Sequence, residues 1–368
     1  MAAQPLKGIL ATVGDTPLVE LERLSADLGL RVLAKIEKFN PGGSIKDRSA
    51  LSMLREAVRT GEVVPGRTTV IESSSGNLAI GIAHICRYLG VRFVCVVDAR
   101  TTEQNLAILR AYGAEVEVVT EPDPVSGDYL PRRLRRVAEL AAAVPDSYVP
   151  GQYDNPFNPR AHLRTMREID EALDGAVDYL FCAAGTTGTL GGCAAYVREH
   201  ALPTTVVAVD AVGSRLFGSP VTCPRLIPGH GAAVVPALLD PAAADRVVHV
   251  GDLESVVGCR RLVDREAVLA GGSSGALVAA LEKLAPELPA GSCCVLILPD
   301  GGDRYLDTIY SDAWVGRHFG DVAHLWSGPA APDTARTPPA TTVTGPATTA
   351  TTAMPTQRRA PLVDHRTW

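Results

Sequence analysis

The sequence contains no apolar run long enough to cross a membrane, and residues 1–10 lack the apolar core of a signal peptide. It also has no basic stripe, and its formal net charge at pH 7 is -6. A group of arginines falls on one predicted helix and is interpreted as its solvated face: Arg132, Arg133, Arg135 and Arg136. These absences disfavour export, membrane association and nucleic-acid binding, so we expect a cytoplasmic protein.

The cysteines include no C-x-x-C pair. Several lie in apolar stretches predicted to be strands or helices, and the adjacent pair Cys293-Cys294 opens a predicted strand. We therefore expect buried, reduced thiols, with neither a disulfide framework nor a metal site. The eight residues are Cys86, Cys95, Cys182, Cys193, Cys223, Cys259, Cys293 and Cys294.

The composition that remains is that of a soluble globular protein, with 46% hydrophobic and 21% charged residues. A length of 368 residues suffices for two domains. From residue 327 onward the sequence changes to mostly Ala, Pro and Thr. That segment has too few apolar residues to bury a core, so residues 327–368 are predicted to be a disordered tail.

Strands and helices are predicted to alternate along the rest of the chain, which indicates an α/β fold with a parallel sheet covered by helices on both faces. Residues 145–159 are predicted to cross between domains, and residues 213–236 to be irregular. The strands are expected at residues 16–20, 30–37, 68–71, 92–97, 115–119, 179–183, 205–210, 247–250 and 294–298. Helices are expected at residues 49–60, 78–90, 102–112, 130–144, 161–173, 190–200, 253–269 and 275–284.

The most informative stretch is Asn40-Pro41-Gly42-Gly43-Ser44-Ile45-Lys46-Asp47-Arg48. It joins a predicted strand to a predicted helix, so Lys46 lies at or near a helix N-terminus. The positive end of the helix dipole disfavours a protonated lysine, and a neutral lysine is a nucleophile that forms imines. On this stretch alone, an exposed loop lysine with Asp47 in the first helical turn remains the simpler interpretation.

Two serine-rich stretches also open predicted helices. Glu72-Ser73-Ser74-Ser75-Gly76-Asn77 follows a strand, and its backbone N–H groups and hydroxyls suit a carboxylate or phosphate. A plain serine cap is the alternative, although three serines exceed what a cap needs. Gly271-Gly272-Ser273-Ser274-Gly275 alone is a capped helix start, with Ser273 or Ser274 as the capping residue.

A third stretch, Gly185-Thr186-Thr187-Gly188-Thr189, follows a strand and opens a helix, which suits one phosphate group. It is neither a Walker loop nor G-x-G-x-x-G, and a tight glycine turn is an equal alternative. Together the stretches provide an imine-forming lysine, a phosphate site and a carboxylate site. Pyridoxal 5′-phosphate needs the first two, and an amino-acid substrate needs the third.

The pattern resembles the cysteine synthase/cystathionine β-synthase family of pyridoxal-phosphate enzymes, known as fold type II. Matching stretches run from Gly14-Asp15-Thr16-Pro17-Leu18 to Gly302-Asp303-Arg304-Tyr305-Leu306. The resemblance implies a tryptophan-synthase-β-like fold, with two three-layer α/β domains and the cofactor in the cleft between them. It implies a large cofactor-binding domain of residues 1–45 with 148–326, a smaller mobile domain of residues 46–147, and a homodimer.

The resemblance also implies a role for individual residues. Lys46 would form the imine with the cofactor, Asn77 would bond the ring hydroxyl, and Ser273 would face the ring nitrogen. The cofactor phosphate would be bound by Gly185, Thr186, Thr187, Gly188 and Thr189. The substrate would be bound by Ser74, Ser75, Gly76, Gln152 and Tyr153, and Arg225 would bind a phosphate leaving group.

Departures from cysteine synthases indicate a branch of the family. Leu78 replaces a hydroxyl residue, and Tyr153 stands where phenylalanine is usual. Both departures argue against plain cysteine synthesis, and the stretches at 73–78, 225–232 and 304–312 resemble N-(2-amino-2-carboxyethyl)-L-glutamate synthases. Such transferases join O-phospho-L-serine to L-glutamate for 2,3-diaminopropionate biosynthesis, and a dehydrogenase would act on the product for a siderophore or peptide antibiotic.

Two other functions remain open from the sequence. One is a cysteine synthase that uses sulfide with O-acetylserine or O-phosphoserine. The other is a catalytically silent binding protein, which the intact lysine, phosphate and carboxylate stretches argue against. Arg215 and His230 are further candidates for the cation at the leaving group.

Removal of residues 327–368 is expected to leave turnover and thermal stability nearly unchanged, because the segment offers little apolar surface for packing. Thermal melting and steady-state rates of the full and shortened chains test this. A large drop in melting temperature would show that the segment docks on the rest of the protein.

Overall fold

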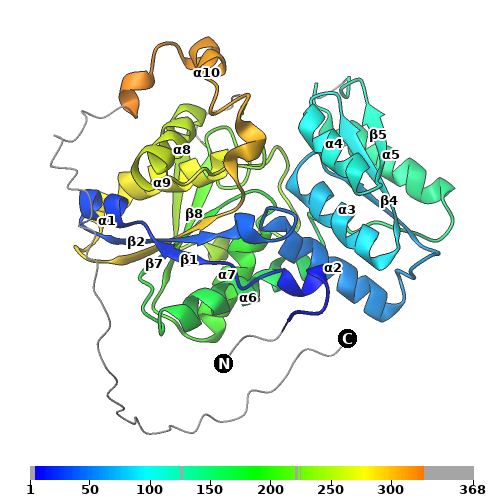
Figure 1. Cartoon of the computed structure of the whole chain (residues 1–368), viewed down its shortest axis with the longest axis horizontal. Coiled ribbons are helices and arrows are strands. Elements are labelled where there is room, and N and C mark those ends of the chain that lie inside the picture. Colours follow the sequence, from blue (N-terminus) through cyan, green and yellow to red (C-terminus); the bar gives the residue numbers. More distant parts are fainter. Residues whose placement is uncertain (1–4, 125–126, 220–222, 224, 327–368) are drawn as a thin grey trace, which may run out of the picture. The chain divides into compact units, whose positions relative to one another are not determined.

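The computed structural model describes residues 5–124, 127–219, 223 and 225–326. The predicted disordered tail, residues 327–368, lies outside the described residues. Two sheets organise the described chain (Figure 1). Apart from Tyr148 of the smaller sheet, their strands lie in the sequence ranges of the two predicted domains, whose boundaries remain a prediction.

The larger sheet has six strands in the order β1-β2-β10-β7-β8-β9. Its strands are β1 (Leu18–Glu20), β2 (Arg31–Ile36), β7 (Tyr179–Ala183), β8 (Thr205–Ala211), β9 (Arg246–Val250) and β10 (Cys293–Leu298). All neighbours pair in parallel except β1, which pairs antiparallel with β2 at the edge. The expectation of a parallel sheet is therefore wrong for this edge strand, which the chain reaches without a full crossover.

The smaller sheet has four parallel strands in the order β5-β4-β3-β6. They are β3 (Thr69–Ser73), β4 (Arg92–Asp98), β5 (Glu115–Val119) and β6 (Ser147–Tyr148). β6 lies in the segment predicted to cross between domains. Its two residues are too few to produce a periodic pattern, so the sequence did not reveal it.

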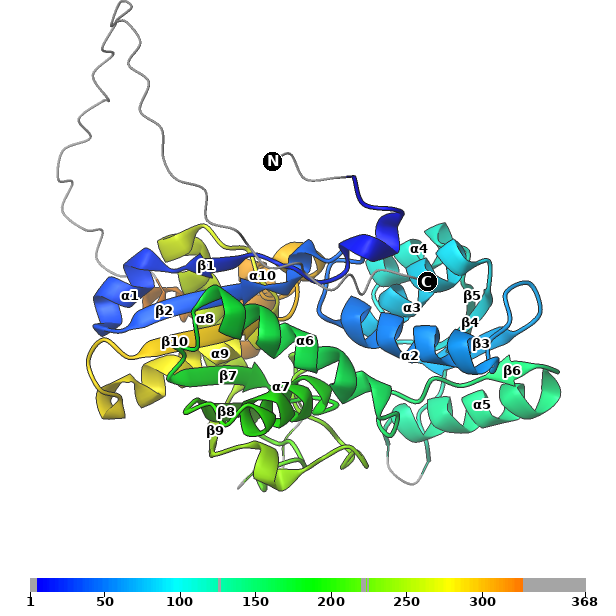
Figure 2. The same ribbon diagram turned by 90° about the horizontal axis from the view of Figure 1, so that it is seen from below.

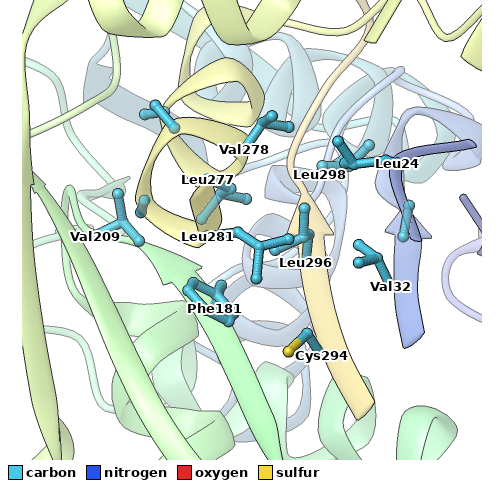
Figure 3. Packing of buried hydrophobic residues seen from close by; sticks show 14 of the residues in the cluster. Leu24, Val32, Phe181, Val209, Leu277, Val278, Leu281, Cys294, Leu296 and Leu298 are labelled. Atoms are coloured by element: carbon cyan, nitrogen blue, oxygen red, sulfur yellow. The ribbon is translucent and has the colours of Figure 1, made fainter. Parts of the chain in front are cut away.

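Helices cover both faces of the larger sheet (Figure 2). Successive strand residues point to opposite faces, so Leu296 packs in one cluster and Val295 in the other. Figure 3 shows the first cluster, in which Leu277 and Leu281 face Phe181 and Leu296. The helices that cover this sheet are α1 (Glu22–Leu28), α6 (Phe157–Ala172), α7 (Gly188–Glu199), α8 (Asp252–Glu266) and α9 (Gly272–Leu284). α10 (Asp312–Phe319) packs on α8, where Val315 shares a cluster with Val256 and Cys259.

The helices of the smaller sheet are α2 (Lys46–Thr60), α3 (Asn77–Leu89), α4 (Glu103–Ala111) and α5 (Leu130–Ala143). α2 packs against both α3 and α6, and so contacts elements of both sheets. Short 3-10 helices lie at Ile9–Thr12, Glu37–Phe39, Pro241–Ala243, Ala285–Glu287, Gly302–Tyr305 and Ala323–Leu325.

Three expectations about side chains or elements are corrected by the structure. α1 and α10 were not predicted, and both are short. Arg133 of α5, expected on the solvated face of that helix, has a side chain only 12% exposed, whereas Leu134 beside it is 43% exposed. Cys223 is exposed, whereas the other cysteines are buried. Within the described residues, no helix has both the length and the apolar character needed to span a membrane.

Candidate active site

Lys46, Asn77, Gly188 and Gly272 are the first residues of α2, α3, α7 and α9. Each helix therefore begins earlier than predicted, inside the motif that was read as the loop before it. β3 leads into α3 and β7 into α7, so these motifs lie at the carboxyl ends of parallel strands. That edge is where α/β proteins bind ligands, because helix N-termini and loops meet there.

The lysine loop is held by contacts that its glycines permit. Gly42 N donates to Asp47 Oδ2 at 2.5 Å, in space that a side chain on Gly42 would fill. Gly43 has φ of +84° and lies against the Arg304 guanidinium. Ile45 N donates to the Pro299 carbonyl at 2.8 Å, which joins the loop to the end of β10. The loop therefore presents Lys46 at the first turn of α2, as predicted.

A buried ionic network also anchors the lysine loop. Arg48 Nε donates to Glu37 Oε2 at 2.7 Å, and Arg48 Nη2 donates to Glu168 Oε2 at 2.6 Å. Lys35 Nζ lies 2.8 Å from the same Glu168 oxygen. Burial opposes ionisation of Glu168, but the bonds from Arg48 and Lys35 outweigh it and lower its pKa to about 2. The network joins β2, α2 and α6, and Arg48 within it lies two residues after Lys46.

Burial lowers the pKa of Lys46, and the charge of Asp300 opposes that shift. The helix dipole at the start of α2 acts in the same direction as burial. The amine of Lys46 is therefore more readily deprotonated than an ordinary lysine, and a deprotonated amine is the form that attacks an aldehyde.

Asn77 lies beside Asp300 at the start of α3. Its Nδ2 donates to Asp300 Oδ2 at 2.7 Å, and the Tyr305 hydroxyl donates to the same oxygen at 2.6 Å. The Arg304 guanidinium bonds the Asn77 side-chain oxygen and also donates to the Gly42 carbonyl at 2.7 Å. These bonds bring Asn77 and the lysine loop together, and the role of Asn77 toward the cofactor stays a prediction.

The loop from Gly185 to Thr189 is tightly packed around its glycines. A Cβ on Gly185 would lie 2.9 Å from the Gly229 carbonyl oxygen, and one on Gly188 would overlap the Asn158 side chain. Asn158 Nδ2 donates to Thr186 Oγ1 at 3.3 Å. Thr187 adopts φ of +64°, a left-handed conformation that turns the chain into α7. The loop thus directs backbone N–H groups and hydroxyls to the start of a helix, where an anion binds well.

His162 connects this loop to α2. Its ring lies 3.0 Å from Ser49 Oγ, 3.4 Å from Thr189 Oγ1 and 3.2 Å from Thr165 Oγ1. Burial, followed by the charges of Lys46 and Arg48, lowers the pKa of His162 well below its usual value. A neutral imidazole therefore links the start of α7 to Ser49 of α2 without adding charge.

Ser273 is the second residue of α9 and is 8% exposed. Neither Ser273 nor Ser274 caps this helix, because Gly271 is the capping residue and no side-chain cap bond is formed. Gly271 N donates to the Asp300 carbonyl at 3.2 Å, which places the start of α9 beside the lysine loop. Ser274 Oγ is buried and has no hydrogen-bond partner among the described residues.

The loop after β3 contacts the segment that follows β6. Glu72 accepts hydrogen bonds from Ser73 N and Gly151 N, at 2.8 and 2.9 Å. Gln152 Nε2 donates to the Ser73 carbonyl at 3.4 Å. Ser74 Oγ accepts from Ala79 N at 3.3 Å. Ser74, Ser75, Gly76 and Gln152 are thus brought together, and the Asn158 bond to the Gln152 carbonyl, at 2.8 Å, extends this group toward Thr186.

Tyr153 directly follows Gln152, and the charge of Arg225 acts on it. Burial raises the pKa of Tyr153, and the charges of Arg133 and Arg225 oppose the shift. Arg225 Nη1 donates to the His230 carbonyl at 3.0 Å. Burial lowers the pKa of His230 to about 4, so His230 supplies no positive charge near neutral pH. Arg225 and Arg133 are therefore the cations that act on Tyr153.

The sequence reasoning missed Glu72, Arg133, Asn158 and Asp300 as site residues. Arg133 was interpreted as a solvated residue, but it pairs with Asp98 at 3.3 Å. Its Nε and Nη1 are buried and have no hydrogen-bond partner within the described part of the chain. Asp300 had one usable signal, because it directly follows a predicted strand and precedes the matching stretch at 302–306.

A family model described as pyridoxal-phosphate dependent enzyme matches residues 9–300. The chain belongs to the pyridoxal-phosphate-dependent enzyme family. This match confirms the predicted fold class, enzyme class and cofactor.

Relatives of the family can be compared over most of the chain. It is 46% identical over 312 residues to the N-(2-amino-2-carboxyethyl)-L-glutamate synthase of Ralstonia nicotianae, covering 84% of this chain and 91% of the relative. A crystal structure of O-ureido-L-serine synthase matches with a TM-score of 0.77 and 33% identity, covering 85% of this chain and 100% of that one. An O-acetylserine-dependent cystathionine β-synthase from Helicobacter pylori matches with a TM-score of 0.76 and 30% identity, covering 84% and 100%.

The residues present fit pyridoxal phosphate. A lysine with a lowered pKa lies at a helix start, and a packed glycine–threonine loop near it suits a phosphate. The buried Ser274 hydroxyl and one oxygen of Asp300 lack partners among the described residues, so polar groups are available for a ligand.

Glu72 should make stability depend on pH. Burial raises its pKa from 4.5 to about 7, against the backbone N–H bonds that it accepts. The folded protein therefore binds a proton that the unfolded chain releases between these values, and stability should fall as pH rises from about 4.5 to about 7. The free energy of unfolding should fall by up to about 3 kcal/mol over this pH range.

Glu72→Gln, which cannot ionise, should flatten this slope. Urea denaturation of both proteins at several pH values between 5 and 8 measures it, with Glu115→Gln on the exposed face of β5 as the control. Parallel slopes for wild type and Glu72→Gln would mean that Glu72 does not titrate in this range.

Proposed function

We propose that this enzyme joins O-phospho-L-serine to L-glutamate, producing N-(2-amino-2-carboxyethyl)-L-glutamate and phosphate. The observation that carries the proposal is the 46% identity, over most of both chains, to the Ralstonia synthase of that product. Leu78 and Tyr153 depart from the cysteine synthase pattern and so argue against plain cysteine synthesis.

The cofactor, when bound, supplies an aldehyde for Lys46 and an electron-withdrawing ring. Lys46 is proposed as the base that takes the proton from Cα of phosphoserine and later returns it. Between these transfers the bond from Cβ to the phosphate oxygen breaks, and the α-amine of glutamate forms a bond to Cβ. Ser74, Ser75, Gly76 and Gln152 are proposed to bind the carboxylate of phosphoserine through hydroxyl, amide and backbone donors.

The remaining assignments orient the reaction. Asn77 is proposed to bond the ring hydroxyl, Gly185 to Thr189 the cofactor phosphate, and Ser273 the ring nitrogen. A neutral serine at that nitrogen limits full protonation of the ring, which favours elimination over transamination. The start of α7 contributes its dipole to phosphate binding.

Charge near Tyr153 supports two anionic substrates. Arg133 and Arg225 both act on the Tyr153 hydroxyl electrostatically. Phosphoserine and glutamate together bring several negative charges, which a partly buried site must neutralise. Arg225 is proposed for the phosphate that leaves, and Arg133 for a carboxylate of glutamate.

A cysteine synthase is the second candidate, because solved relatives such as the O-acetylserine-dependent cystathionine β-synthase share 30–33% identity with this chain. The two functions use different nucleophiles, sulfide or glutamate, and both would use Lys46 in the same way. We also propose a cytoplasmic homodimer, a small domain of residues 46–147 that moves against residues 1–45 and 148–326, and a dehydrogenase that acts on the product for siderophore or antibiotic biosynthesis.

Product analysis tests the proposed function. The purified protein should be yellow, and phosphoserine with glutamate should yield the carboxyethyl-glutamate product by mass spectrometry. Lys46→Ala should abolish turnover, and Lys38→Ala, at a neighbouring lysine outside the loop, should retain it. Faster product formation with sulfide than with glutamate would favour the cysteine synthase, and borohydride labelling of another lysine would contradict the role of Lys46.

Arg225→Ala should slow the reaction of phosphoserine by roughly 10- to 150-fold, because a charge-assisted bond to phosphate contributes about 1.5–3 kcal/mol. Stopped-flow absorbance with phosphoserine and with O-acetylserine measures the loss for each donor. The exposed Arg215 of the same segment provides the control variant Arg215→Ala. An equal loss for both donors, or none, would remove Arg225 from the phosphate site.

A further inference from the structure

Asp300 lies where the starts of α2, α3 and α9 meet. Ser44 of the lysine loop pairs with Asp300 in an isolated antiparallel bridge, and Gly271 N donates to the Asp300 carbonyl. Asn77 Nδ2 and the Tyr305 hydroxyl bond one carboxylate oxygen. Asp300 is 3% exposed, so its carboxyl group belongs to the interior of the site.

The other carboxylate oxygen of Asp300, Oδ1, is available to accept a bond from a further donor. Asp300 Oδ1 is buried and has no hydrogen-bond partner among the described residues. Gly271 has no side chain, and a Cβ there would overlap this oxygen. A buried carboxylate oxygen without a donor is costly, which indicates that a donor is present in the working enzyme.

Lys46 is the basic group of the mechanism whose charge acts on Asp300. The titratable and charged groups that face Asp300 are Lys46 from α2, Arg304 and Tyr305 from the 3-10 helix at Gly302–Tyr305, and Cys259 from α8. Arg304 already bonds Asn77 and the Gly42 carbonyl. Burial raises the pKa of Asp300, and Tyr305, Asn77, Arg304 and Lys46 all favour its charged form.

A buried lysine that accepts a proton needs a compensating charge. Burial alone would make the protonated nitrogen unfavourable, so Lys46 would lose strength as a base. An adjacent carboxylate offsets that cost when the positive charge develops. Asp300 is placed for this, because its backbone pairs with Ser44, two residues before Lys46, and its Oδ1 has no partner among the described residues.

We propose that Asp300 is a positioning residue that supplies the counter-charge for protonated Lys46 nitrogen while fixing Asn77. This inference rests on the proposed role of Lys46 as the cofactor-binding lysine, and it does not depend on which substrates the enzyme joins.

The test follows the colour of the imine between Lys46 and the cofactor in the full-length holoenzyme as pH is raised, without substrate. Asp300→Asn keeps the shape of the side chain and removes its charge. The midpoint at which the protonated, yellow form is lost should move down by about 1–3 pH units, the effect of an opposite charge at close range. Asp300→Glu should restore most of the difference.

Asp303→Asn is the matched control, because Asp303 is an exposed carboxylate in the same turn. It should leave the midpoint within about 0.3 pH units of wild type, since exposed charges are well screened. An unchanged midpoint in Asp300→Asn, or an equal shift in Asp303→Asn, would overturn the proposal.

A second measurement applies if a variant fails to bind the cofactor. The rate at which an acylating reagent modifies Lys46 in the full-length apoprotein would be followed against pH by peptide mapping. Lys46 should react at lower pH in Asp300→Asn than in wild type, and identical profiles would overturn the inference. Failure of phosphoserine or glutamate as substrates would leave both readouts unaffected, and would count only against the proposed reaction.

Discussion

The ion pairs of Arg48 with Glu37 and Glu168 are the contacts on which the site depends most. Arg48 lies two residues after Lys46, and Glu37 directly follows β2, so the network fixes both ends of the lysine loop. All three side chains are at most 9% exposed. Removing one partner would leave an uncompensated buried charge, which typically costs about 3–5 kcal/mol. The Asp47-Arg48 pair that follows the lysine is therefore structural as well as diagnostic, because Asp47 accepts a bond from Gly42 N and Arg48 ties the loop to Glu37 and Glu168.

The motifs that sequence reasoning identified are those in which adjacent residues share a task. Lys46, Asn77, Gly185 to Thr189 and Ser273 each lie in a short stretch that opens a helix, and residue type and local geometry are linked there. Glu72, Asn158 and Asp300 act through partners 79, 28 and 223 residues away. The spacing of residues along the chain cannot predict contacts between such distant partners. Arg133 was misread for a related reason, since helical periodicity locates a face but not what covers it.

The fold was predictable to a similar extent. Most strands and helices alternate with clear periodicity, and their ends differ from the predicted ones by a few residues. The errors gather at helix starts, because glycine and serine read as loop residues even where the chain is already helical. The antiparallel β1 and the two-residue β6 depend on tertiary pairing, which local propensity does not encode.

The chain passes from the six-stranded sheet to the four-stranded sheet after β2, and returns after β6. The two connections between the sheets define a line through both of them. Rotation of one sheet against the other about that line is the easiest motion that the connections permit. Gly151 and Gln152 lie just beyond the return connection, and Lys46 lies just beyond the outgoing one. The residues proposed to hold the substrate carboxylate and the reactive amine are thus close to the axis. In the domain movement proposed above, these residues would move least and the more distant parts of the smaller sheet would move most.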